Sequence, residues 1–221
     1  MHFASLSIVS DSTKYPDQYY DNNVLGTLSL LNAMREHQIR HIVFSSSCAV
    51  YGNVVQTPIT EGVLKKPENP YGSSKDMVER ILIDFDSAHG IKSVILRYFN
   101  AAGSDPEGEI GENHNPETHL IPLILEVALG RQPFITIFGD DYPTDDGSCI
   151  RDYVHVMDLA NAHILALERL QKSNKSAIYN IGSGKGYSVK EVIKHVEEIS
   201  KTSIPIKIGK RREGDVATLY S

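Results

Sequence analysis

Tyr71 and Lys75 stand four residues apart in the stretch Asn69-Pro-Tyr-Gly-Ser-Ser-Lys75, and their types suit proton transfer. Asn69 is a favourable N-cap and Pro70 suits the first helical position, so both side chains are predicted on one helix face. A phenol has a pKa of about 10, which a nearby ammonium group lowers by favouring the phenolate. The pair can therefore serve as an acid/base unit for an alcohol proton, although this spacing also occurs on ordinary solvated helices.

A group of hydroxyls precedes this predicted helix. The run His41-Ile-Val-Phe-Ser-Ser-Ser47 is apolar and β-rich before it ends in three serines. Open parallel sheets place ligands at the carboxyl ends of their strands, so Ser47 is positioned to hydrogen-bond the group that Tyr71 deprotonates. The alternative interpretation is structural, because serines at a strand end also cap turns.

The composition is that of an ordinary globular protein. The 221 residues are 41% hydrophobic and 23% charged, with a formal net charge of -6. This predicts one large or two small domains and excludes a general positive field for nucleic acid. No apolar run approaches the roughly 20 residues that a membrane crossing needs. Cys48 and Cys149 are predicted to be buried thiols in a reducing compartment, which favours a cytoplasmic protein.

Helical and extended patterns alternate in the first half. Residues 17–38 carry Val24, Leu28, Leu31 and Met34 on one helical face, and the Tyr71 helix is predicted to end near Ala88. Strands are predicted up to Ser46 and over 93–99. This alternation predicts right-handed βαβ units in a doubly wound parallel sheet. Residues 5–16 are predicted to be a loop, and residues 2–4 the end of a buried strand.

A change in composition at Ala101 predicts a domain boundary. Residues 103–117 are rich in Gly, Pro, Asn, Asp and Glu, as loops are. Beyond them the sequence predicts helices over 120–130, 157–170 and 188–200, and strands over 134–138, 151–156, 177–181 and 204–208. The chain is therefore predicted to divide into residues 1–100 and a smaller α/β domain over 101–221.

Three other features are interpreted as structural. Gly182-Ser-Gly-Lys-Gly186 lacks the spacing of a phosphate loop and is predicted to be a strand-to-helix turn. His155 and His163 show no recognised ligand spacing, so no metal site is predicted. Cys48 has no histidine at motif spacing and is interpreted as a packing residue.

Taken together, these motifs resemble the UDP-glucose 4-epimerases, a family of the extended short-chain dehydrogenase/reductases. The strand-end serine with Tyr-x-x-x-Lys is common to that whole superfamily, whereas residues 147–159 are more specific. The motifs that carry the resemblance are His2–Ala4, Tyr19–Val24, Phe44–Ser47, Val50–Gly52, Tyr71–Lys75, Arg97–Asn100, Thr118–Pro122, Phe138–Thr144, Asp146–Tyr153, His155–Leu159 and Arg211–Asp215.

The resemblance implies inversion at C4 of a UDP-hexose, which interconverts UDP-glucose and UDP-galactose through transient oxidation by a tightly held NAD. Tyr71 would take the proton of the sugar 4-hydroxyl, Ser47 would bridge the 4-oxygen, and Lys75 would hold the nicotinamide ribose and lower the pKa of Tyr71. Further NAD contacts are implied for Phe3, Ala4, Asn22 and Phe99. Contacts with the UDP group are implied for Asn100, His119, Leu120, Phe138, Arg151, Arg212 and Asp215.

By the same resemblance, residues 1–100 correspond to a Rossmann-like NAD-binding domain without its first strands, and residues 101–221 to a UDP-sugar-binding domain incomplete at its C-terminus. The glycine-rich turn that cradles the NAD pyrophosphate is not among the 221 residues. A homodimer packed through the helices of residues 17–38 and 71–88 is also implied. His119 and Ser7 stand where other members carry Asn and Lys.

Two alternatives stay open at this point. One is another nucleotide-sugar enzyme of the superfamily. A dehydratase, however, needs an acidic pair directly after the strand-end hydroxyl, where Cys48 and Ala49 stand. The other is a partial remnant that binds UDP-sugar without catalysis, which the missing glycine-rich turn favours. The sequence hypothesis is an epimerase shortened at both ends.

Overall fold

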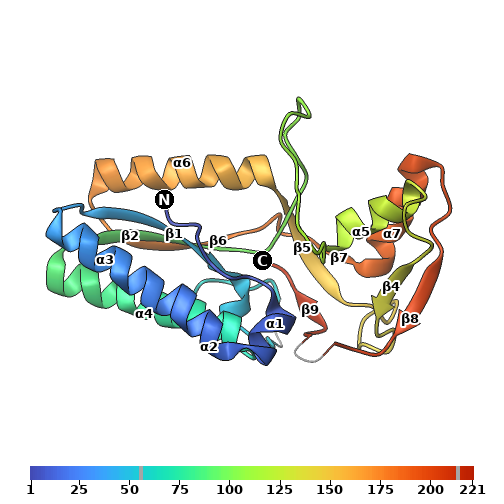
Figure 1. The fold of residues 1–221 in the computed structure, drawn as a ribbon, viewed down its shortest axis with the longest axis horizontal. Coiled ribbons are helices and arrows are strands. Elements are labelled where there is room, and N and C mark those ends of the chain that lie inside the picture. The colour runs from blue at the N-terminus through green and yellow to red at the C-terminus, as the bar shows by residue number, and fades with distance from the viewer. Residues whose placement is uncertain (55–56, 213–214) are drawn as a thin grey trace.

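The computed structural model describes residues 1–54, 57–212 and 215–221. Its central sheet has three parallel strands in the order β1–β2–β6, formed by His41–Ser47, Lys92–Tyr98 and Ala177–Ile181. Helices α3 (Gly26–Glu36) and α4 (Pro70–His89) cover one face of this sheet, and α6 (Val156–Ser173) covers the other (Figure 1). The predicted doubly wound parallel sheet is therefore confirmed.

Alternating residues of β1 supply two separate apolar layers. Ile42 and Phe44 face α3 and α4, where they pack with Leu31 and Leu82. Val43 faces α6 and packs with partners that include Leu170. All of these side chains are buried, so burial on both faces explains the continuous apolar run Ile42–Phe44 within β1.

A second, smaller module follows α4 and β2. Helices α5 (Leu120–Ala128) and α7 (Val189–Ser200) pack on β4 (Ile135–Phe138), which pairs in parallel with β8 (Ile206–Gly209). Ser188 begins α7 with a capping box, since its hydroxyl accepts from the Glu191 N–H at 3.0 Å while the Glu191 carboxylate accepts from the Ser188 N–H.

A small sheet lies between the central sheet and this second module. Its strands are β3 (Asn100–Ala102), β5 (Ile150–His155), β7 (Gly186–Ser188) and β9 (Thr218–Leu219). β5 is paired with all three others, in parallel with β3 and β9 and antiparallel with β7.

The central sheet contains residues from both sides of the division predicted at residue 100. After the second module begins, the chain returns through α6 to the central sheet, where β6 pairs in parallel with β2. A parallel neighbour requires a long crossover, and here residues 100–176 provide it. Residues 156–181 therefore belong with the first sheet.

The N-terminal predictions also need correction. Residues 5–16 are not all loop, because Val9–Lys14 form the short helix α1, in which the Ser12 hydroxyl donates to the Val9 carbonyl at 2.7 Å. The long helix predicted over 17–38 is three joined pieces: α2 (Pro16–Tyr19), the π-helical segment η1 (Tyr20–Leu25) and α3. His2 forms a single parallel bridge with Phe44, and Phe3 is 58% exposed rather than buried.

Within residues 1–54, 57–212 and 215–221, no helix has both the length and the apolar character that a membrane crossing requires.

The N-terminus of α4 supplies a stability test. The Asn69 side chain accepts from the Gly72 N–H at 2.9 Å, as predicted for an N-cap. Asn69→Ala should lower the free energy of unfolding by about 1 kcal/mol, measured by urea denaturation. Arg80→Ala on the exposed face of α4 is the matched control and should change it by less than about 0.5 kcal/mol. Equal effects of the two substitutions would contradict the assignment of the cap.

Candidate functional site

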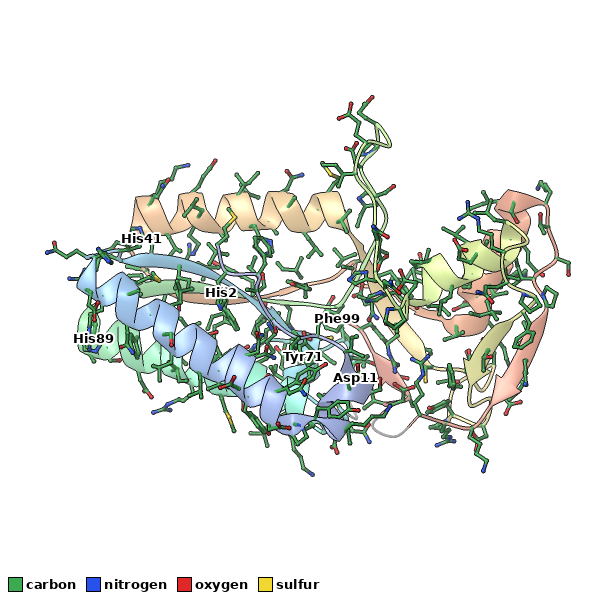
Figure 2. All side chains as sticks on the ribbon, in the orientation of Figure 1. His2, Asp11, His41, Tyr71, His89 and Phe99 are labelled. Atoms are coloured by element: carbon green, nitrogen blue, oxygen red, sulfur yellow. The ribbon has the colours of Figure 1, made fainter. Side chains whose placement is uncertain are left out.

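The first turn of α4 lies directly against the end of β1. A Cβ atom on Gly72 would meet the Ala49 carbonyl oxygen at 2.6 Å, so a larger residue there would push the helix away. This close approach brings Tyr71 to the carboxyl end of the sheet (Figure 2). There the Ser47 hydroxyl is close enough to act on the Tyr71 phenol. His41 and His89, at the start of β1 and the end of α4, lie at the opposite end of the central sheet from Tyr71.

Lys75 is buried beneath Tyr71. Its side chain is among the buried polar groups at 4% exposure, and its Nζ donates to the Ser45 carbonyl at 2.8 Å. The same Nζ lies 5.0 Å from the centre of the Phe44 ring and 5.7 Å from that of Tyr71. Burial lowers the pKa of Lys75 to about 8, and none of the ion pairs among the described residues gives it a carboxylate partner.

The pKa of Tyr71 departs from the prediction. Burial raises it well above the ordinary value of a phenol, and the Ser47 hydroxyl opposes this rise only in part. Lys75 does not produce the predicted lowering, because its ammonium group is directed to the Ser45 carbonyl and is itself desolvated. Tyr71 is therefore protonated in this state of the chain, and Ser47 is the neighbour that favours its phenolate.

A buried ion pair anchors α4 one turn beyond Lys75. Glu79 and Arg97 are 0% and 2% exposed, and the guanidinium donates to both carboxylate oxygens, at 2.8 and 2.6 Å. The Ser46 hydroxyl donates to Glu79 at 2.6 Å and Lys65 Nζ donates at 3.0 Å. These bonds hold the Glu79 carboxylate ionised, so its pKa is lowered although burial opposes this.

Sequence reasoning missed Glu79. Tyr71, Lys75 and Glu79 follow one another at four-residue spacing and so share one face of α4. Each of the three serines that end β1 contacts one residue of that helix face. The Ser45 carbonyl accepts from Lys75, the Ser46 hydroxyl donates to Glu79, and the Ser47 hydroxyl acts on Tyr71. The spacing alone was a signal that could have identified Glu79 as an inward-facing residue.

The other residues predicted to contact NAD fall into two groups. Phe3 and Ala4 are exposed, and the Phe3 ring lies 4.6 Å from that of His163. Asn22 is also exposed and donates to the Asn23 side chain at 2.9 Å. Phe99, in contrast, is 4% exposed and packs in an apolar cluster with Cys48 and Tyr51, so its side chain is a core residue.

The residues predicted for the UDP group lie between the small sheet and the second module. The Arg212 guanidinium stacks 3.9 Å from the centre of the Phe138 ring, and Arg151 on β5 lies 3.7 Å from the Asp215 carboxylate. Glu213 and Gly214, which belong to the same sequence motif, lie outside the described residues.

The three remaining residues of this group occupy other positions. Asn100 on β3 is paired in register with Tyr153 on β5. His119 is the N-cap residue of α5, and Leu120 packs on the apolar core of the second module. The structure thus brings together two pairs of the predicted residues, Arg212 with Phe138 and Arg151 with Asp215. Within the described part of the chain, no side-chain hydrogen bond or ion pair joins these two pairs to Asn100, His119 or Leu120.

Comparisons with known proteins identify the family and the relatives that this chain matches. A model of the NAD dependent epimerase/dehydratase family matches residues 1–182. Over its full length the chain is 54% identical to a UDP-glucose 4-epimerase of Halalkalibacterium halodurans and 51% identical to one of Lacticaseibacillus casei, covering 66% and 67% of those proteins. The chain therefore spans about two thirds of the length of the curated relatives it matches.

Solved structures that this chain resembles are also UDP-glucose 4-epimerases. A UDP-glucose 4-epimerase from Brucella ovis in complex with NAD matches all of this chain with a TM-score of 0.95 and 46% identity, and the match covers 68% of that chain. One from Bifidobacterium longum in complex with NAD+ and UDP matches all of this chain with a TM-score of 0.94 and 42% identity, over 66% of its own length.

The burial of Lys75 predicts a dependence of stability on pH. An unfolded lysine has a pKa of about 10.4, whereas burial lowers the pKa of Lys75 to about 8 in the folded chain. Between these values the unfolded state binds more protons, so the cost of the buried charge is fully present below pH 8 and is relieved as pH rises. Between pH 7 and pH 10 the folded protein should therefore gain about 2–3 kcal/mol relative to Lys75→Met.

Urea denaturation at both pH values measures this difference. Lys172→Met is the matched control, since the Lys172 side chain is 78% exposed and its removal should leave the pH dependence of the wild type intact. If Lys75→Met kept the full pH dependence of the wild type, Lys75 would not be the desolvated group.

Proposed function

This chain belongs to the NAD dependent epimerase/dehydratase family, and from that premise we propose that it carries the proton-transfer site of a UDP-glucose 4-epimerase and interconverts UDP-glucose and UDP-galactose. One observation supports this most strongly: Ser47, Tyr71 and Lys75 converge at the carboxyl end of β1 in a chain about half identical to proteins of that activity. The chain spans about two thirds of those relatives, so their activity is a proposal here.

The donors at this site fit the nicotinamide end of NAD. Lys75 has three N–H donors, and the Ser45 carbonyl is the partner that the structure gives it. A buried ammonium group without an anion is costly, and ribose hydroxyls are acceptors that it can bind. When bound, NAD supplies the acceptor, and then the donor, of the hydrogen at C4 of the sugar. The residues proposed to contact NAD are Tyr71, Lys75, Phe3, Ala4, Asn22 and Phe99.

The chain's own residues would then control the proton of the sugar 4-hydroxyl. Tyr71 takes this proton as general base and returns it as general acid, while Ser47 hydrogen-bonds the 4-oxygen. Because burial raises the pKa of Tyr71, the base form needs positive charge nearby. In this proposal Lys75 supplies it by turning its Nζ from the Ser45 carbonyl toward Tyr71, whose ring centre lies 5.7 Å away. With a pKa of about 8, Lys75 is mostly protonated at pH 7.

Recognition of the UDP group is proposed for the residues of the second module and the small sheet. Arg151 and Arg212 are planar donors suited to a pyrophosphate, and the Phe138 ring on which Arg212 stacks holds that guanidinium in place. Asp215 lies close enough to Arg151 to orient it. Asn100, His119 and Leu120 complete the proposed set.

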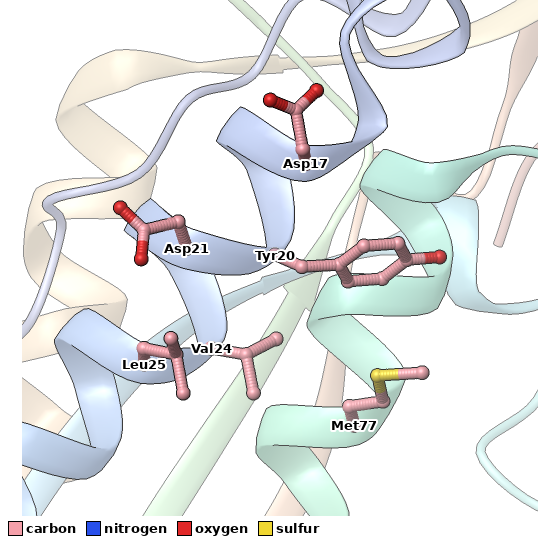
Figure 3. A pocket seen from close by; sticks show the side chains of 6 residues that line it. All are labelled: Asp17, Tyr20, Asp21, Val24, Leu25 and Met77. Atoms are coloured by element: carbon pink, nitrogen blue, oxygen red, sulfur yellow. The ribbon is translucent and has the colours of Figure 1, made fainter.

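A homodimer in the cytoplasm is also part of the proposal. The helices expected to form the interface enclose a hollow of about 390 Å³ lined by Asp17, Tyr20, Asp21, Val24, Leu25 and Met77 (Figure 3). Leu25 and Met77 are 55% and 47% exposed and line this hollow together with Val24, so the two helices share an apolar patch that a second copy of this chain could cover.

Conversion of UDP-galactose to UDP-glucose, with NAD supplied, tests the proposed activity. Tyr71→Phe should lower the turnover rate at least about 100-fold, because it removes the proton-transfer group. Tyr15→Phe is the matched control, since Tyr15 is 51% exposed outside the site and should keep the wild-type rate.

A folded chain that bound UDP-hexose in calorimetry but showed no turnover would contradict catalysis, and would leave UDP-sugar binding alone. Turnover that was unaffected in Tyr71→Phe would contradict the role given to Tyr71. Conversion of N-acetylated UDP-hexoses but not of UDP-galactose would point to another nucleotide-sugar epimerase.

A further inference from the structure

Four potential metal ligands converge in the segment that leads into α5. Residues 103–119 project from the body of the molecule as the green segment of Figure 1 and then return to the start of α5. On the returning side, Glu112, His114, Glu117 and His119 each offer one ligand atom, and all four atoms lie within 4.8 Å of one another. The sequence prediction of no metal site considered His155 and His163, and it overlooked these residues.

The contacts within this cluster are crowded around one imidazole nitrogen. His119 Nδ1 lies 2.7 Å from a Glu112 oxygen and 2.8 Å from a Glu117 oxygen. The same Glu112 oxygen lies 2.9 Å from His114 Nδ1. A single N–H can donate to only one acceptor well, so the two carboxylates compete for one proton. A divalent cation in this position would instead give each oxygen and each nitrogen a direct bond.

One of the ligands is held in place by the backbone. The Glu117 oxygen accepts from the N–H groups of Thr118 and His119, both at 2.7 Å. Such bonds orient a carboxylate before a metal binds, as the outer partners of metal ligands do in established sites. Because this carboxylate is already oriented, its binding requires little further ordering.

The spacing fits a small transition-metal ion. Tetrahedral zinc with bonds of about 2.1 Å separates its ligand atoms by about 3.4 Å. The present separations, from 2.7 Å up to 4.8 Å, lie on both sides of that value, so modest side-chain rotations suffice. Two imidazoles with two carboxylates favour zinc-like ions over calcium or magnesium, which prefer oxygen ligands alone.

We propose that Glu112, His114, Glu117 and His119 form a binding site for a zinc-like divalent transition-metal ion in the segment that leads into α5. An ordinary exposed ion pair is the competing account, and α7 provides an example of one in His195 and Glu198, at 3.6 Å. The proposed site differs because two histidines and two carboxylates meet at one point. The proposal does not depend on the function proposed above.

Titration of tag-free, metal-stripped protein with Zn²⁺ in calorimetry tests the site. We expect one equivalent to bind with a dissociation constant at or below about 10 µM. His114→Ala and Glu112→Gln should each weaken binding at least about 10-fold, since each removes a ligand. His195→Ala removes a histidine from the exposed pair on α7 and is the matched control that should bind as the wild type does.

Co²⁺ provides a second measurement on the same variants. Four-coordinate Co²⁺ should give a visible absorption band in the wild type and in His195→Ala, and the band should be lost in His114→Ala, with circular dichroism confirming that each variant is folded. The proposal would be overturned by the absence of saturable Zn²⁺ binding below about 100 µM. It would also be overturned if His114→Ala bound Zn²⁺ as tightly as the wild type.

Discussion

The buried pair of Glu79 and Arg97 is the interaction on which the position of the proposed site depends. Both side chains are almost fully removed from water, and such burial is tolerated only where the geometry and the surrounding hydrogen bonds compensate for lost hydration. Here the bidentate contact is completed by Ser46 and Lys65 on the carboxylate and by the Tyr51 hydroxyl, which accepts from Arg97 at 2.8 Å. One network thus fixes α4 to β1, to β2 and to the chain that connects β1 to α4, in which Tyr51 and Lys65 lie.

Lys75 and Tyr71 of the proposed site lie one turn and two turns before Glu79 on α4. Their surroundings, unlike those of Glu79, do not favour the charged form of the side chain. Lys75 is a buried cation to which the described residues give no carboxylate partner, and burial raises the pKa of Tyr71 instead of preparing its phenolate. The buried charge of Lys75 costs stability at neutral pH, as is common where a group is arranged for binding or proton transfer. The raised pKa of Tyr71 does not, because the phenol is protonated in both the folded and the unfolded state at that pH. The same helix face therefore carries the buried ion pair and a destabilising lysine, and the ion pair holds the lysine in place.

Local chemistry could be predicted from the sequence, and pairings across long distances could not. Asn69 caps its helix as predicted, because a cap depends only on neighbouring residues, and Ser188 caps α7 by the same kind of local bond. The four-residue spacing from Lys75 could place Glu79 on the inward face of α4, but its pairing with Arg97 could not be predicted because Arg97 lies on another element. The return of β6 to the central sheet depends on the whole crossover, and the Glu112–His119 cluster lies in a loop that has no periodicity. The π-helical turn of η1 likewise has no signature in the hydrophobic pattern.

A double-mutant cycle on Glu79 and Arg97, measured by equilibrium unfolding, tests the central claim most directly. If the pair anchors α4, Glu79→Gln and Arg97→Gln should each lower the free energy of unfolding by about 3–5 kcal/mol, because each leaves a buried charge without a partner. The double variant should lose at least about 2 kcal/mol less than the sum of the two. Small, additive losses of less than about 1 kcal/mol each would contradict the account, because α4 would then be held by apolar packing alone.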